Sequence, residues 1–130
     1  MEIPNNVEII ETPTSTMWFD EDGILYSISK KHPPSTIEES QKALDDLKKI
    51  IKDQKVCMLL DITNSSPSSK EMRDFAAEEM PKIAKAIAII STSALGRMVA
   101  NLFFGLKPPP YPMKMFSDEK EVKEWLKQYL

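Results

Sequence analysis

The run KVCMLLDIT, residues 55–63, constrains the fold of this chain more than any other segment. It is a continuous apolar stretch of strand length, without the alternation of apolar and polar side chains that a half-exposed strand shows. Both faces of such a strand must be covered, which favours a central strand parallel to a neighbour. The run AIAII, residues 86–90, has the same character. The two runs therefore predict neighbouring buried strands of an α/β sheet.

Amphipathic helical segments separate and follow these runs. Two of them open with the spacing of a capping box, Ser35 with Glu38 and Ser68 with Glu71. The apolar stripes are Ile37, Ser40, Leu44, Leu47 and Ile51 in the first helix, Met72, Phe75, Ala76 and Met80 in the second, Leu95, Met98, Val99, Leu102 and Phe103 in a third, and Val122, Trp125, Leu126 and Tyr129 in a fourth that follows the cap Ser117. Each stripe lies on one helix face, which predicts helices that pack on a sheet.

The first third of the chain has the pattern of short strands. Residues 6–29 alternate apolar and polar side chains around a hairpin turn at residues 20–23, where Gly23 is free to adopt a positive φ. A last strand is predicted over residues 113–117. The order βββ-αβ-αβ-αβ-α predicts an α/β fold over residues 1–130, with a mixed sheet, antiparallel at its N-terminal side and parallel beyond, and about four helices. The chain length suits one domain.

Composition excludes several classes of function. The net charge is −3, and lysine and glutamate are interleaved along the sequence, so we expect neither a nucleic-acid binder nor a polybasic patch for anionic membrane. No apolar stretch approaches the roughly 20 residues that span a bilayer. The single cysteine, Cys57, precludes an internal disulfide, and the N-terminal residues lack the pattern of a signal peptide. We expect a cytoplasmic protein.

The residues of the common catalytic and metal sites are scarce. The chain has one histidine, His32, before two prolines, and Cys57 lies in a predicted buried strand, so a Cys–His pair is not expected. No cluster has the ligand spacing of a zinc site. Three glycines cannot form a phosphate-binding loop or a dinucleotide fingerprint. We expect a protein that is not an enzyme and that holds no metal or cofactor.

The order of elements resembles that of a known family. With LLDIT at residues 59–63 before a serine-rich loop, and FSDEKEVKEWL at residues 116–126 near the end, the chain resembles the SpoIIAA-like branch of the STAS superfamily. These are small bacterial domains similar to anti-sigma-factor antagonists, with a fold related to the CRAL-TRIO lipid-binding fold. The resemblance covers nearly the whole chain and implies a regulatory domain that acts by protein binding.

The resemblance also implies a phosphorylation site. In true antagonists an Asp-Ser-Ser-Gly motif opens the helix after the central strand, and a partner kinase phosphorylates a serine there. Residues 64–70, NSSPSSK, occupy that place without the Asp or the Gly, and Ser68 and Ser69 are the nearest matches. Helix capping and turn formation alone would also explain these serines.

Ligand contacts are expected where the buried strands end, since open α/β sheets bind ligands at the carboxyl ends of their strands. Asp61 ends the first buried run and would either contact a ligand or accept backbone N–H bonds in its own loop. Beyond the second run, hydroxyls and a cation at a helix N-terminus form a candidate anion site, with plain N-capping as the alternative. Its residues are Ser91, Thr92, Ser93 and Arg97.

Residues 103–112, FFGLKPPPYP, are the segment that helix capping does not explain. Their aromatic and apolar side chains are Phe103, Phe104, Leu106 and Tyr111. One interpretation is a stiff connector whose aromatic rings fold back over the core. The other is an exposed apolar surface for a partner, or a flap over a hydrophobic ligand.

Two functions remain in view. The first is a non-enzymatic STAS-like regulatory module that binds a protein partner, another protein or a second copy in a homodimer, through the serine loop and residues 103–112. The second is a carrier or sensor of a small apolar or anionic ligand near residues 91–112. An enzyme of undescribed type has the least support.

Overall fold

A six-stranded sheet organises the protein. The structure is a computed structural model that describes residues 3–31, 33, 35–64, 69–91 and 109–130. The strands are β1 (Ile10–Glu11), β2 (Ser15–Phe19), β3 (Leu25–Ser29), β4 (Val56–Asp61), β5 (Ala84–Ile90) and β6 (Met113–Phe116), and they lie in the sheet in chain order. β1, β2 and β3 pair antiparallel, and β3 to β6 pair parallel. The predicted α/β fold with a mixed sheet is confirmed.

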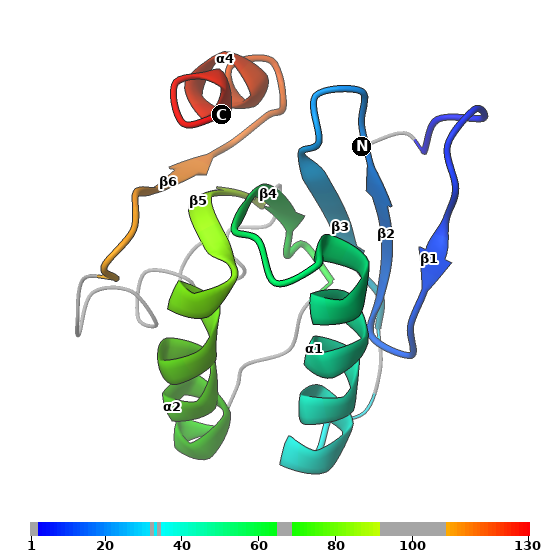
Figure 1. Ribbon diagram of the computed structural model, residues 1–130, viewed down its shortest axis with the longest axis vertical. Coiled ribbons are helices and arrows are strands. Elements are labelled where there is room, and N and C mark those ends of the chain that lie inside the picture. The colour runs from blue at the N-terminus through cyan, green and yellow to red at the C-terminus, as the bar shows by residue number, and fades with distance from the viewer. Residues whose placement is uncertain (1–2, 32, 34, 65–68, 92–108) are drawn as a thin grey trace.

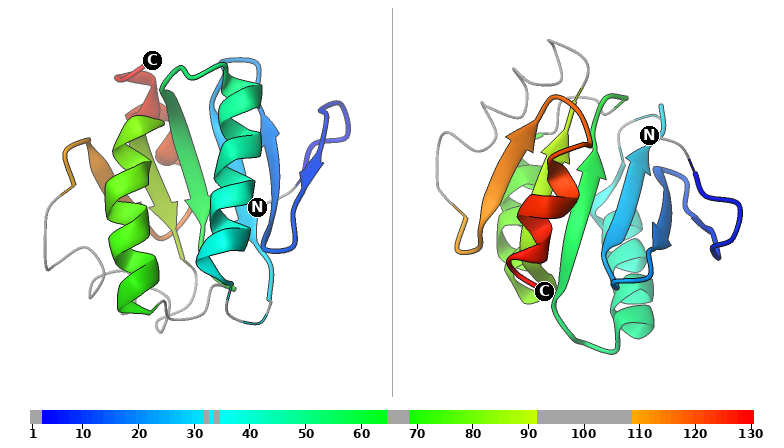
Figure 2. Two further views of the ribbon diagram at one scale, coloured as in Figure 1. Left: turned by 60° about the horizontal axis from the view of Figure 1, so that its bottom comes forward. Right: turned by 90° about the horizontal axis from the view of Figure 1, so that it is seen from above.

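Helices cover both faces of the sheet (Figures 1 and 2). On one face lie α1 (Ile37–Ile51) and α2 (Lys70–Glu79), the latter continued by the short 3-10 helix η1 (Met80–Lys82). On the other face lies α4 (Val122–Lys127). About four helices were predicted; three α-helices are present among the described residues, and the one predicted over residues 93–103 lies outside them.

The continuous apolar run of β4 is explained by this double cover. Cys57 and Leu59 point to the α4 side, where they pack in one buried cluster with Leu126. Met58 points to the opposite side and packs with α1 residues such as Leu47. Because successive side chains of a strand alternate between faces, a strand between two helical layers needs apolar residues at every position.

Both long helices begin one residue later than the capping-box spacing predicted. Thr36 caps α1: its Oγ1 accepts the N–H of Glu39 at 3.1 Å, and the Glu39 Oε1 accepts the N–H of Thr36 at 3.2 Å. Ser69 caps α2, so its N3 residue is Met72 and no reciprocal glutamate bond forms. The prediction of Ser35 as the cap of α1 was therefore wrong.

The C-terminal helix is shorter than predicted. It begins at Val122, and its N-cap residue Glu121 makes no side-chain capping bond, so Ser117 is not the cap. Residues 118–120 form a turn instead, in which the Asp118 carboxylate accepts the N–H of Lys120 at 2.9 Å. An Asp side chain competes for local backbone N–H groups in this way, which favours a turn over a helix at these residues.

The β2–β3 hairpin is tied to α4 by one carboxylate. Asp20 Oδ1 accepts the N–H groups of Asp22 and Ile24 at 2.9 and 3.0 Å, around Gly23 with φ 80°. Its Oδ2 accepts the hydroxyl of Tyr26 at 3.2 Å and lies 3.5 Å from the Lys123 Nζ on α4. The Asp20 carboxylate therefore stabilises the hairpin turn by hydrogen bonds and links it to α4 by an ion pair.

This arrangement predicts a loss of stability at alkaline pH. Burial, followed by the negative charge and hydrogen bond of Asp20, raises the pKa of Tyr26 from 10.0 to about 12. The unfolded chain releases this proton at lower pH than the folded protein, so the stabilisation is complete below pH 10 and is lost as the pH rises toward about 12. Chemical denaturation at a series of pH values across this range should show that the free energy of unfolding falls less steeply for Tyr26→Phe than for the wild type. Tyr129→Phe, the control, leaves Tyr26 and Asp20 in place and should decline like the wild type; identical declines for Tyr26→Phe and the wild type would contradict the prediction.

Candidate functional site

The ends of two helices meet where the parallel strands finish. β3 leads into α1 and β4 leads toward α2, and β3 and β4 are parallel neighbours. Right-handed crossovers from neighbouring parallel strands start their helices at one edge of the sheet. Figure 2 shows α1 and α2 side by side on one face, with their N-terminal ends at the same end of the molecule.

A groove separates the two helix N-termini. It has a volume of about 450 Å³ and is open to solvent. Its lining residues are Ser35, Thr36, Ile37 and Glu38 from the start of α1 and Ser69, Glu71 and Met72 from the start of α2. The Ser40 hydroxyl lies 3.9 Å from the Met72 sulfur, so the helices are in contact just beyond it. We call this feature the α1–α2 groove.

Ser69 presents an exposed hydroxyl to the α1–α2 groove. Its backbone is extended (φ −69°, ψ 162°), as an N-cap requires, and its Oγ accepts the N–H of Met72 at 3.2 Å. A phosphate on this oxygen would meet the free N–H groups and the positive dipole end of α2. The position can therefore carry a phosphate without loss of the helix. Ser68, the other predicted site, lies outside the described residues.

The rim of the groove is acidic. Glu38 and Glu71 are exposed, and neither forms an ion pair with any residue that the structure describes. The neighbouring Lys70 pairs with Asp74 at 3.0 Å along the α2 surface. Addition of up to about two negative charges at Ser69 would therefore make the rim of the groove more negative still.

The Asp61 carboxylate accepts a hydrogen bond within its own loop. Its Oδ1 accepts the N–H of Thr63 at 3.0 Å, directly after β4. The loop is held further by Asn64, whose N–H and side-chain amide donate to the hydroxyl and carbonyl of Ser29 at 3.2 and 3.4 Å. These bonds match the structural alternative for Asp61, a carboxylate that accepts backbone N–H bonds.

The predicted anion site is described only at its first residue. Ser91 follows β5, is fully buried, and takes part in an interaction within the protein. Thr92, Ser93 and Arg97 lie outside the described residues. The two helix N-termini that the structure does place together belong to α1 and α2, a pairing that the sequence interpretation missed. The signal was available in the order of elements, because two consecutive crossovers from parallel neighbours start their helices at one edge.

Tyr111 packs against the α1–α2 side of the core. It is half-buried beside the cluster that contains Leu44 and Ile87, and this burial raises the pKa of its hydroxyl. This placement matches the connector interpretation for Tyr111, in which the ring folds back over the core. Phe103, Phe104 and Leu106, predicted with it as a partner surface or flap, lie outside the described residues.

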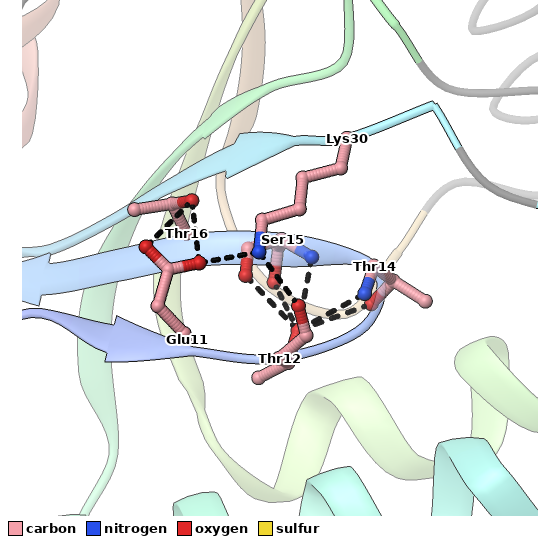
Figure 3. Close-up of polar contacts among 6 residues, drawn as sticks. All are labelled: Glu11, Thr12, Thr14, Ser15, Thr16 and Lys30. Atoms are coloured by element: carbon pink, nitrogen blue, oxygen red, sulfur yellow. Dashed lines mark hydrogen bonds and ion pairs between the residues drawn. The ribbon is translucent and has the colours of Figure 1, made fainter.

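A second group of polar side chains lies in the β1–β2 turn (Figure 3). Thr12 Oγ1 accepts the N–H of Ser15 at 2.9 Å and lies 3.0 Å from the Ser15 hydroxyl. Glu11 pairs with Lys30, and the hydrogen bond from Lys30 lowers the pKa of Glu11. Lys30 also donates to the carbonyl oxygen of Thr12 at 3.0 Å. These groups bind one another, so the cluster fastens the β1–β2 turn to the end of β3.

The described part of the chain contains neither a metal-binding cluster nor a membrane-spanning helix. No three His, Cys, Asp or Glu side chains there are grouped so that they could hold a metal ion. None of the described helices has the length and apolar character that crossing a membrane requires.

The fold and the groove define a small α/β domain with an N-cap serine exposed between two helix N-termini. The chain belongs to the family of the domain of unknown function DUF7793, whose model matches residues 17–130. No protein of curated function matches it.

Two solved structures are similar to the chain. One is an uncharacterized protein of the DUF3478 family with a SpoIIAA-like fold from Shewanella loihica PV-4, at 22% identity over 92% of this chain and 91% of that one, with a TM-score of 0.49. The other is a protein of unknown function from Arthrobacter sp. FB24, at 25% identity over 85% of this chain and 97% of that one, with a TM-score of 0.31.

Proposed function

We propose that this protein is a non-enzymatic regulatory module of the cytoplasm that binds a protein partner at the α1–α2 groove, and that phosphorylation of Ser69 controls the binding. The observation that carries the proposal is the position of the Ser69 hydroxyl, which is exposed, caps α2 and lines the groove beside the first turn of α1. A modification there alters the groove and leaves the buried core untouched.

The charges around the groove determine which partner surfaces would bind more weakly or more tightly after phosphorylation of Ser69. Glu38 and Glu71 already make the rim negative, and α1 adds Glu39 in its first turn. A phosphate at Ser69 adds charge of the same sign within the same groove. Phosphorylation should therefore weaken contact with an acidic or apolar partner surface and strengthen contact with a basic one.

The test is native mass spectrometry of the protein purified gently from its own cells. We expect a mass increment of one phosphate group that is absent from Ser69→Ala and present in Ser117→Ala, a matched control with an exposed serine outside the helices. An increment that persists in Ser69→Ala would contradict the assignment of Ser69. A non-covalent adduct that leaves on unfolding, without any phosphate, would support the ligand carrier instead.

A further inference from the structure

Two lysine-rich segments, residues 48–55 and 78–85, meet at the end of the sheet opposite the α1–α2 groove. The α1–β4 connection and the end of α2 lie together at that end (Figure 2). The N–H of Val56 donates to the carbonyl oxygen of Ile83 at 2.9 Å, and Val56 pairs with Ala84 in the sheet. The tertiary structure therefore joins the two segments in one surface, which we call the basic end.

Positive charge is concentrated in the basic end. The lysines are Lys48, Lys49, Lys52, Lys55, Lys82 and Lys85, and the carboxylates are Asp53, Glu78 and Glu79. Glu79 pairs with Lys48 at 3.5 Å and with Lys82 at 3.2 Å. The other four lysines are exposed and form no ion pair with any residue in the described ranges. Within these two segments lysines exceed carboxylates by three. The neighbouring β2–β3 turn lies at the same edge of the sheet, because Leu25 pairs with Met58, and its carboxylates Asp20, Glu21 and Asp22 pair with Lys123. The excess of positive charge is therefore confined to the connections that follow α1 and α2.

The backbone at the end of α1 presents one of these lysines in an unusual conformation. Lys52 is the C-cap of α1 with φ 55° and ψ 43°, and Asp53 follows with φ 57°. Glycine adopts this left-handed region without a steric penalty, whereas a lysine there strains the helix end. At position 52 the side chain therefore adds charge to the basic end while it reduces the stability of the fold.

The pattern of charge and apolar surface favours a protein partner. Ile50 is 45% exposed and lies between Lys49 and Lys52 in the chain, so the surface has an apolar contact beside its cations. Asp53, Glu78 and Glu79 interrupt the positive charge and would repel a uniformly anionic surface such as a nucleic-acid backbone or a lipid bilayer. We propose that the basic end binds an acidic segment of a partner protein, whose carboxylates pair with the exposed lysines and whose apolar side chain covers Ile50.

This binding is independent of Ser69. The 15 residues of α1 separate the two ends by about 22 Å at 1.5 Å per residue. The Debye length at physiological ionic strength is about 8 Å, so charge at the α1–α2 groove is screened from the basic end. The basic end is therefore a second surface, and the proposal holds whether or not Ser69 is phosphorylated.

The experiment measures binding of a synthetic peptide in which one leucine is flanked by glutamates, with the same peptide in glutamine form as reference. We expect the wild type to bind the glutamate peptide, more weakly at higher salt, and to ignore the glutamine peptide. Replacement of Lys49, Lys52 and Lys55 by Gln should weaken binding on the order of tenfold. Lys52→Gly should weaken it by about twofold while the melting temperature stays equal or rises, which separates binding from folding.

The matched control replaces Lys31, Lys70 and Lys120 by Gln, three exposed lysines outside the basic end, and changes the net charge equally. We expect it to bind the glutamate peptide like the wild type. Equal weakening in this control, or no binding by the wild type, would overturn the proposal. So would tighter binding to phosphatidylserine-containing vesicles or to a duplex oligonucleotide than to the peptide.

Discussion

Replacement of Leu126 by alanine is expected to destabilise the protein by about 3 kcal/mol and to lower its melting temperature by roughly 10 °C. Leu126 is completely buried, and with Val122 it forms the apolar contact of the short helix α4 with the sheet. The substitution leaves a cavity in place of one of the two buried side chains of α4. Thermal and chemical denaturation would measure the change.

The same variant should expose the single cysteine. Cys57 is 1% exposed, its sulfur lies 3.9 Å from the carbonyl oxygen of Leu126, and burial raises the pKa of its thiol. Local opening of α4 should therefore make Cys57 react faster with a thiol reagent in Leu126→Ala than in the wild type. Lys127→Ala, at the next and exposed position, should change neither property. A stable Leu126→Ala with an unreactive thiol would show that α4 contributes little to this layer.

Replacement of Ile87 by alanine should destabilise the protein by about 3 to 4 kcal/mol. Ile87 lies in β5, between β4 and β6, is 1% exposed, and faces the layer formed by α1 and α2. Its neighbours belong to a sheet and two helices that cannot close the space without a shift of the backbone. Urea denaturation would give the free energy of unfolding.

The conservative variant Ile87→Val is the control for Ile87→Ala. It removes one methyl group and should cost about 1 kcal/mol. Because Ile87 lies on the face opposite Cys57, the thiol in folded Ile87→Ala should stay as unreactive as in the wild type. Equal losses of stability in the alanine and valine variants would contradict the view that cavity volume sets the cost.

Much of the fold could be predicted because a strand that is buried on both faces has apolar residues at consecutive positions. The run at residues 55–63 predicted a strand covered on both sides, and Cys57, Met58 and Leu59 are buried on alternate faces of β4. The helix face of α1 was equally predictable, since Leu44 and Leu47 recur at helical spacing. The exact N-cap residues were harder to predict. Adjacent Ser35 and Thr36 both carry a hydroxyl that can cap the helix, and only the backbone geometry selects one of them.

The candidate site was predictable in part. The serine loop after β4 led to Ser69, because helix capping depends on residue type close in sequence. That the start of α1 forms the other wall of the groove depends on strand order, and the sequence interpretation did not bring these two helix starts together. For Asp61 the choice between a ligand contact and a loop contact required the position of the Thr63 N–H.

The sequence by itself determined the elements, their order and the two-sided burial of the central strands, since these follow from local periodicity and from the small set of allowed crossovers. The tertiary structure alone decided which surfaces those elements form. Along the chain lysine and glutamate are interleaved, and this argued against a basic surface for nucleic acid or anionic membrane. The pairing of β4 with β5 brings residues 48–55 and 78–85 to one end, and the parallel start of α1 and α2 places Ser69 between two helix N-termini. Charge acts through space over about a Debye length, so its effect is set by the folded neighbours of each residue and not by the neighbours in the sequence.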